Sequence, residues 1–251
     1  MTTLITRDVP YAYCGVNMMG LLCAPAGAAG TPGVLLVPDA YGFTHDAQET
    51  AMRLAMLGYS VVVADMWGGR HIATSEDQIG PLIGSVASDR EAWMGRLGAA
   101  VDAACAQPEI EPRSLAGLGY CVGGSGVLEY ARTGGTLAAA IAVHPGLDLL
   151  GSDWSSGRPT RVLACVGSED PLANEQMRDS LASGLTSSGC DWELQLYSGT
   201  KHAFTSKAAL STSMPDVVAF HPRNAARAWD ATVRFLAELR DDTSPPPRER
   251  P

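Results

Sequence analysis

The sequence predicts an α/β fold, a doubly wound and mostly parallel sheet with helices on both faces. Short apolar runs rich in β-branched residues alternate along the chain with segments of helical apolar spacing, and glycines mark many of the junctions. The 251 residues are 46% apolar, which is enough for a sizeable core. No repeat or linker interrupts the alternation, so we expect one domain over residues 1–239. Residues 240–251 are proline-rich and charged, which predicts a disordered tail.

The first elements predicted are three strands. Mixed polar and apolar stretches at Tyr11–Val16 and Met18–Ala24 indicate a strand pair joined near Gly15. Val34–Val37 is a short apolar run that ends at Pro38, as is typical of a strand buried on both faces. The chain therefore begins with a hairpin and then enters the centre of a sheet.

A helix is predicted over Asp46–Leu57, where apolar residues recur at three-to-four spacing. Thr44 is the expected N-cap, and Gly58 stands where a left-handed C-terminal residue belongs. The β-rich run Tyr59–Ala64 follows as the next strand. This strand–helix–strand unit predicts a parallel crossover.

A long helix is predicted over Asp89–Ala106, because Ser88 followed by Glu91 has the spacing of a capping box. The segment His71–Val86 before it is interpreted as a loop that selects the substrate. The remaining strands and helices are expected in alternation at Leu115–Tyr120, Gly123–Arg132, Leu137–Val143, Arg161–Val166, Asn174–Ser183, Trp192–Tyr197 and Asn224–Leu239.

Composition narrows the class of protein. The 18 basic and 27 acidic residues give a net charge of −9, which argues against a nucleic-acid or anionic-membrane partner. No apolar run is long enough for a membrane helix and the N-terminus lacks a secretory signal, so we expect a cytoplasmic enzyme. Six cysteines without a CxxC pair or zinc-ligand spacing indicate reduced thiols, and we expect neither a metal nor an organic cofactor. The sequence leaves the oligomeric state open.

The most informative motif joins a predicted strand directly to a predicted helix. In Gly119-Tyr120-Cys121-Val122-Gly123, glycines stand two residues before and two after the cysteine. This is the pattern of a nucleophile elbow, in which small residues let strand and helix approach each other. The helix N-terminus stabilises a thiolate and the oxyanion formed when it attacks a carbonyl. No G-x-S-x-G competes for this role, so Cys121 is the candidate nucleophile; the alternative is a buried structural cysteine.

An acid and a histidine follow in the order that an elbow hydrolase requires. Asp170 or Glu169, after the strand Arg161–Val166, is a candidate to orient an imidazole. His202, after the strand Trp192–Tyr197, is the candidate base. Because the carboxyl ends of parallel strands meet at one sheet edge, we expect Cys121, the acid and His202 to lie together.

These motifs resemble the dienelactone hydrolase family of α/β-hydrolases, which use a Cys-Asp-His triad. The resemblance covers about residues 10–239. It includes the elbow with its two partners, the strand-end motif Val34–Gly42, the segment Ala64–Arg70 and the start of the last helix at Asn224–Trp229. It implies an α/β-hydrolase-type sheet and a carboxylic ester hydrolase of the carboxymethylenebutenolidase type.

The resemblance also implies roles for further residues. The backbone N–H groups of Val122 and Ala40 correspond to the oxyanion hole. Asp39 stands where the family usually has a glutamate that holds the resting thiol, and it is one methylene shorter. Tyr41 follows in the same motif as a candidate substrate contact.

Arginines hold the substrate carboxylate in well-known family members. Arg70 corresponds to the first of them, whereas after His202 only Lys207 is basic, and an ammonium does not replace a two-pronged guanidinium. An ester, lactone or thioester other than dienelactone is therefore an equally good expectation.

The expected function is hydrolysis of a small-molecule ester or lactone through Cys121, Asp170 and His202, with a thioester acyl-enzyme. The first alternative is a general carboxylesterase or thioesterase on the same triad. The second is a non-catalytic, redox-sensing protein in which Cys121 is a reactive thiol, with Cys165 as the candidate resolving cysteine. His144 is expected at the active-site edge, either as a pocket residue or in a structural hydrogen bond.

Overall fold

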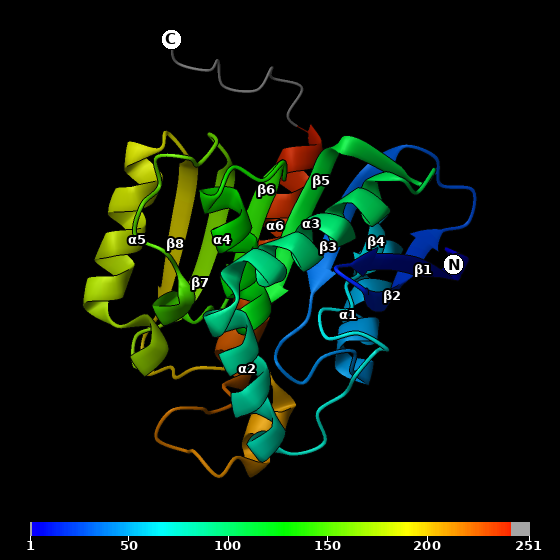
Figure 1. Ribbon diagram of the computed structural model, residues 1–251. Helices are drawn as coiled ribbons and strands as arrows, with labels where there is room; N and C mark the ends of the chain where they lie inside the picture. Colours follow the sequence, from blue (N-terminus) through cyan, green and yellow to red (C-terminus); the bar gives the residue numbers. More distant parts are fainter. Residues whose placement is uncertain (1, 242–251) are drawn as a thin grey trace.

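All eight strands belong to one sheet in the computed structural model, which describes residues 2–241 (Figure 1). The strand order is β1-β2-β4-β3-β5-β6-β7-β8. The strands are β1 (Leu4–Tyr13), β2 (Val16–Pro25), β3 (Thr31–Val37), β4 (Ser60–Val63), β5 (Ile110–Tyr120), β6 (Ala139–Val143), β7 (Arg161–Gly167) and β8 (Asp191–Tyr197).

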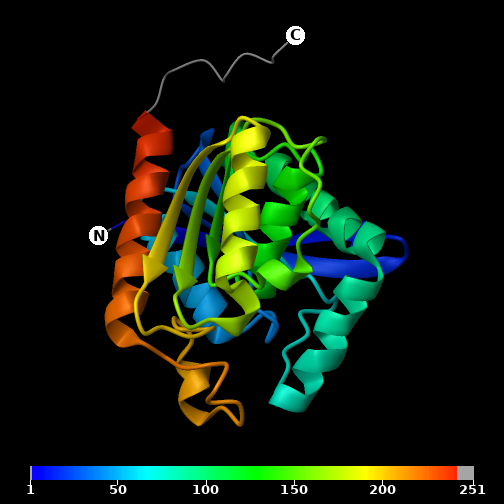
Figure 2. The ribbon, with the colours of Figure 1, turned by 90° about the vertical axis from the view of Figure 1, so that its left-hand side faces the viewer.

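Helices cover both faces of this sheet (Figure 2). They are α1 (His45–Met56), α2 (Ile79–Ser88), α3 (Arg90–Cys105), α4 (Val122–Arg132), α5 (Glu175–Ser187) and α6 (Pro222–Asp241). Short 3₁₀ turns are η1 (Glu76–Gln78), η2 (Leu147–Leu149), η3 (Pro171–Ala173) and η4 (Lys207–Ser211). Strands β3 to β8 run parallel, and β1 and β2 form an antiparallel hairpin whose second strand pairs with β4. The predicted fold class is confirmed.

The core has two layers because successive side chains of a strand point to opposite faces. On β3, Leu35 and Val37 belong to the core layer that includes side chains of α3, α4 and α5, whereas Val34 and Leu36 belong to the layer that includes side chains of α1 and α6. All four side chains are buried, and burying each contributes about 1.5–3 kcal/mol of hydrophobic free energy. These central strands end on the sheet edge that carries the candidate nucleophile.

Helix α1 begins and ends within one residue of the predicted Asp46–Leu57. The Thr44 hydroxyl accepts the Ala47 N–H at 3.4 Å, and Gly58 has a φ of +98°. Both the N-cap and the left-handed glycine are confirmed.

Helix α3 has a different cap from the one predicted. The Asp89 carboxylate accepts the Ala92 N–H at 2.9 Å, because Ser88 is the last residue of α2. The expectation of a loop over residues 71–86 is wrong for its second half, which forms α2. Pro81 does not prevent this helix since it lies in the first turn, where no backbone donor is lost.

Two strands are longer than predicted. β1 starts at Leu4 rather than Tyr11, because it pairs with β2 along its whole length, from Leu4 opposite Pro25 to Tyr13 opposite Val16. β5 starts at Ile110, which pairs with Thr31 of β3. Backbone pairing with a partner strand, rather than side-chain alternation, decides both boundaries.

The C-terminal helix α6 continues through Asp241, so two residues of the predicted tail are helical. The rest of that predicted tail, residues 242–251, lies outside the described residues. Over residues 2–241, no helix combines the length and apolarity needed to cross a membrane.

Candidate active site

Cys121 is the single residue between β5 and α4, and its backbone has φ 52° and ψ −123°. Positive φ is unfavourable for a residue with a side chain and costs of order 1–3 kcal/mol. Such strain persists only where the surrounding structure enforces it. Here it turns the chain from strand to helix within one residue and presents the side chain at the carboxyl edge of the sheet.

The two flanking glycines make this turn possible. A Cβ atom on Gly119 would lie 2.1 Å from the Gly123 carbonyl oxygen, and one on Gly123 would lie 2.3 Å from the Val37 carbonyl oxygen. All of these contacts are to backbone, which cannot move aside as a flexible side chain can. The glycine spacing noticed in the sequence is therefore a steric requirement of the strand–helix contact.

Three side chains from three strand ends form one hydrogen-bonded chain. Cys121 Sγ lies 3.2 Å from His202 Nε2, and His202 Nδ1 lies 2.8 Å from Asp170 Oδ2. The second oxygen of Asp170 accepts the Leu172 N–H at 2.9 Å, which fixes the carboxylate. Of the two acids that the sequence left open, Asp170 contacts the imidazole, whereas Glu169 is exposed.

The charges around His202 favour its protonated form. Burial alone would lower the pKa of His202, but the Cys121 sulfur and the Asp170 carboxylate outweigh burial and raise that pKa to about 10. The imidazole can therefore hold the proton of the thiol.

A second buried histidine lies against the first. The rings of His144 and His202 meet edge to face with centroids 5.4 Å apart. The Cys121 backbone N–H donates both to the Val143 carbonyl at 3.1 Å and to His144 Nδ1 at 3.2 Å. His144 Nε2 lies 2.8 Å from the Thr205 hydroxyl. Nδ1 is thus the acceptor and Nε2 the donor of a neutral ring. Burial and the nearby His202 lower the pKa of His144 well below its usual value.

The sequence predicts that His144 lies at the active-site edge but does not identify this contact. His144 also has a positive φ of 41°, so the backbone is turned to bring its ring under the elbow. The position of His144 directly after a predicted strand is the sequence feature that could have indicated this contact.

The two expected oxyanion donors lie at the start of α4 and after β3. The Val122 N–H is in the first turn of α4, where no earlier helical carbonyl is available to accept it. Ala40 is buried in the loop between β3 and α1. Within residues 2–241, neither N–H donates a hydrogen bond to another protein group.

Asp39 is turned toward its own loop. Its Oδ1 accepts the Tyr41 N–H at 3.0 Å, whereas the hydrogen-bond partner of the Cys121 sulfur is His202. Burial and the neighbouring Asp46 raise the pKa of Asp39 to about 6, although the Tyr41 N–H and His202 act in the opposite direction. Asp39, one methylene shorter than the glutamate usual in the family, makes no hydrogen bond to the thiol in this structure.

Arg70 lies against the N-terminal hairpin. Its Nε donates to the Met19 carbonyl at 2.9 Å, and its Nη2 donates to the Gly20 carbonyl at 2.7 Å and to Asp8 at 2.6 Å. The guanidinium also covers the Phe43 ring, with its Cζ 4.7 Å from the ring centroid. These partners differ from the substrate carboxylate expected from the sequence.

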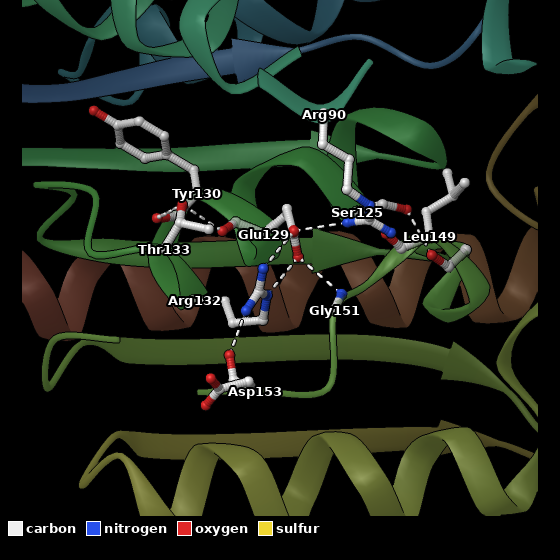
Figure 3. A network of polar contacts seen from close by, with 10 residues as sticks. Arg90, Ser125, Glu129, Tyr130, Arg132, Thr133, Leu149, Gly151 and Asp153 are labelled. Carbon is white, nitrogen blue, oxygen red and sulfur yellow. Dashed lines mark hydrogen bonds and ion pairs between the residues drawn. The ribbon is translucent and has the colours of Figure 1, made fainter. Parts of the chain in front are cut away.

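A buried ion network holds the helix behind the elbow (Figure 3). Glu129 of α4 has a side chain only 1% exposed, and it pairs with Arg90 at 2.7 Å and with Arg132 at 2.7 Å. The Gly151 N–H donates to the same carboxylate at 3.1 Å, and Arg132 also donates to the Asp153 carbonyl. Burial opposes ionisation of Glu129, but these donors lower its pKa below the usual range. The network thereby joins α3, α4 and the loop after η2.

All six cysteines are unpaired. Cys165 is buried under Tyr197, whose hydroxyl lies 3.6 Å from its sulfur, and burial raises the pKa of Cys165 to about 12. A thiol of this kind is a weak nucleophile at neutral pH, which does not favour a resolving role. Within the described part of the chain, no three His, Cys, Asp or Glu side chains are grouped to hold a metal ion.

A mostly parallel sheet with helices on both faces and a strand–cysteine–helix elbow at its carboxyl edge defines the α/β-hydrolase class. The model of the dienelactone hydrolase family matches residues 18–240. The chain belongs to this family, and it is a hydrolase of a small-molecule substrate.

Similar proteins support the assignment of the chain to this family. The dienelactone hydrolase-like promiscuous phosphotriesterase P91 from metagenomic libraries is 30% identical, with a TM-score of 0.87 over 94% of this chain and 98% of its own. The structure named m3DLH is 31% identical, with a TM-score of 0.83 over 94% and 98%. A protein of Aquifex aeolicus (strain VF5), provisionally named a carboxymethylenebutenolidase, is 23% identical over 232 residues, 91% of this chain and 96% of its own.

Proposed function

We propose that this protein hydrolyses a carboxylic ester or lactone through Cys121, His202 and Asp170. The observation that carries the proposal is the continuous hydrogen-bonded chain from the Asp170 carboxylate through the His202 ring to the Cys121 sulfur. A nucleophile in contact with a base that a third group orients is the arrangement used in nucleophilic catalysis.

In the first half of the reaction, His202 takes the thiol proton and Sγ attacks the substrate carbonyl. The Val122 and Ala40 N–H groups hold the oxyanion of the tetrahedral adduct. Collapse of the adduct breaks the carbon–oxygen bond, and the imidazolium gives its proton to the departing alkoxide. The product is a thioester on Cys121; for a lactone, the released hydroxyl stays on the acyl chain.

In the second half, His202 removes a proton from water, and the hydroxide attacks the thioester carbonyl. The second adduct breaks its carbon–sulfur bond and releases a carboxylic acid. The proton on His202 returns to Sγ. Asp170 keeps the ring oriented and stabilises its charge in both halves.

The name of the Aquifex relative makes carboxymethylenebutenolide, a lactone that carries a carboxylate, one candidate substrate to test. P91 is named a promiscuous phosphotriesterase, which makes uncharged esters a second class of candidates. A general carboxylesterase or thioesterase on the same triad remains the alternative within this mechanism. The free cysteines support the cytoplasm as the location, since disulfides are rare there.

The test is selective alkylation combined with turnover. Iodoacetamide at neutral pH, applied to a Cys14→Ser background that removes an exposed thiol, should label Cys121 stoichiometrically and abolish hydrolysis of an aryl acetate. Cys121→Ala should lose at least about 10⁴-fold in kcat while keeping the Tm of the parent. A Cys121→Ala protein that retains most of its turnover would refute the proposal. Turnover of cis-dienelactone then measures how well the butenolide substrate fits.

A further inference from the structure

A cavity of about 700 Å³ lies between two segments at the carboxyl edge of the sheet. One wall comes from residues 74–77, around η1, and the other from residues 208–214, around η4. The Glu76 carboxylate joins the walls, because it accepts the Ser213 N–H at 2.8 Å and also the Ser213 hydroxyl. Tyr41 lines the same cavity.

The cavity adjoins the proposed reaction centre through the chain itself. Tyr41 directly follows Ala40, the proposed oxyanion donor, and η4 begins five residues after His202. Burial, the carboxylates of Glu76 and Asp39, and the Cys121 sulfur all raise the pKa of the Tyr41 hydroxyl, which places that hydroxyl within electrostatic range of both the cavity and the nucleophile. Tyr41 is therefore shared by the cavity and the surroundings of the nucleophile.

The charge of the cavity is negative. The hydrogen bonds from Ser213 and Thr212 lower the pKa of Glu76, so it is ionised at neutral pH. Asp77 adds a second carboxylate. No lysine, arginine or histidine is among the described residues that line the cavity.

The positively charged side chains near this cavity contact other groups. Arg70 is held by carbonyl groups and Asp8 on the hairpin. The Lys201 ammonium donates to the Pro215 carbonyl at 2.7 Å. Lys207 lines a different cavity, of about 340 Å³, which it shares with Asp39 and Trp229. None of them faces the cavity that Glu76 and Asp77 line.

We propose that a substrate bound at Cys121 extends into this cavity, where Glu76 and Asp77 reject carboxylate-bearing molecules, so that the hydrolase selects esters or lactones without negative charge. The inference rests on the proposed function of the triad and adds the charge class of its substrate. A substrate carboxylate in this cavity would meet two carboxylates and no counter-charge, with roughly tenfold loss in kcat/KM for each about 1.4 kcal/mol of repulsion.

The experiment uses two esters of the same size and different charge, 3-carbamoylphenyl acetate and 3-carboxyphenyl acetate. Each kcat/KM is divided by the rate constant for alkaline hydrolysis of the same ester, which removes the difference in leaving-group reactivity. The wild-type protein should prefer the carbamoyl ester by at least about tenfold at low ionic strength, and salt should reduce this preference.

Glu76→Gln tests the origin of the preference, since glutamine can still accept the Ser213 hydrogen bonds. It should lower the ratio of the two rates by about threefold to tenfold. The matched control is Glu238→Gln, which removes the same charge from an exposed pair with Arg234 on α6 and should leave the ratio unchanged.

The outcomes separate the two proposals. Equal or better turnover of the carboxyl ester, or a ratio that Glu238→Gln lowers as much as Glu76→Gln does, would overturn the charge selection while leaving the triad intact. Absence of turnover of both esters by folded protein would refute the proposed function, and the inference with it.

Discussion

The reaction centre and the mouth of the candidate site are built in opposite ways. Cys121, Asp170 and His202 follow three parallel strands, and the two partners of the cysteine are buried. The mouth consists of residues 74–77 around η1 and residues 208–214 around η4, where Leu210 is 73% exposed and Glu76 connects the two walls through Ser213. The sheet fixes the atoms that react, whereas the segments that meet the rest of the substrate are held by few contacts.

This difference separates chemistry from selection. The positions of the sulfur, the imidazole and the carboxylate depend on strand pairing and on glycines that admit no side chain. The charge and size of the cavity depend on exposed residues that can change without disturbing the sheet. Substitutions in the two regions should therefore differ in kind as well as in size.

The largest expected difference is between two glycine substitutions. Gly119→Ala should destabilise the protein by more than about 4 kcal/mol or prevent folding, because the new Cβ would meet the backbone of Gly123 and Gly124 at 2.1–2.5 Å. Gly84→Ala in α2 is the control, since nothing lies within 4 Å of its Cβ and alanine favours a helix by up to about 1 kcal/mol. Urea denaturation measures both. A Gly119→Ala protein as stable as the wild type would contradict the steric account of the elbow.

A buried and an exposed ion pair give the second comparison. Glu129→Ala should cost about 3–5 kcal/mol, because it leaves the partly buried Arg132 and its neighbour Arg90 without their carboxylate. Glu193→Ala, which breaks a surface pair with Arg234, should cost less than about 1 kcal/mol. Thermal or urea unfolding of both variants measures the difference. Equal losses of stability would mean that the buried network around Glu129 stabilises the protein no more than a surface ion pair does.

The smallest effect concerns the neutral histidine under the elbow. The folded-state pKa of His144 is lowered, so below about pH 6.5 the unfolded chain binds a proton that the folded protein excludes. Stability from this residue is therefore present above that pH and is lost on acidification, at up to about 1.4 kcal/mol per pH unit.

His144→Asn tests this, because asparagine tolerates a positive φ and does not titrate. Between pH 6.5 and 5.5, the wild type should lose about 1 kcal/mol more than the variant in urea denaturation. Kinetics give a second measurement. If the His144 ring positions the Cys121 N–H, the variant should show a larger decrease in kcat than increase in KM. Parallel stability losses in the two proteins would show that His144 takes up its proton in the folded state.

Much of the fold follows from local patterns in the sequence. The apolar runs of β3 and β4, the cap of α1 and the glycines around Cys121 are each set by neighbouring residues. The order of nucleophile, acid and histidine along the chain suffices to predict that they meet, because parallel strands end at one edge.

The features that sequence reasoning misses depend on distant partners. The starts of β1 and β5 are decided by strand pairing, and α2 carries Gly80, Pro81 and Gly84, which locally favour a loop. The orientation of the Arg70 side chain depends on carbonyl groups about 50 residues away in the sequence. The orientation of the His144 ring depends on the Cys121 N–H. No local pattern encodes these contacts.

Two fixed residues bracket the segment that forms half of the mouth. Arg70 is fastened to the hairpin before it, and Asp89 caps α3 after it. Within this segment, residues 71–73 are hydrogen-bonded to the Tyr41–Phe43 loop and Val86 is buried, so residues 74–85 are the part that protein engineering can exchange. A library of replacement segments inserted at these positions can change substrate range while the elbow, the imidazole and the strand order keep their inherited geometry.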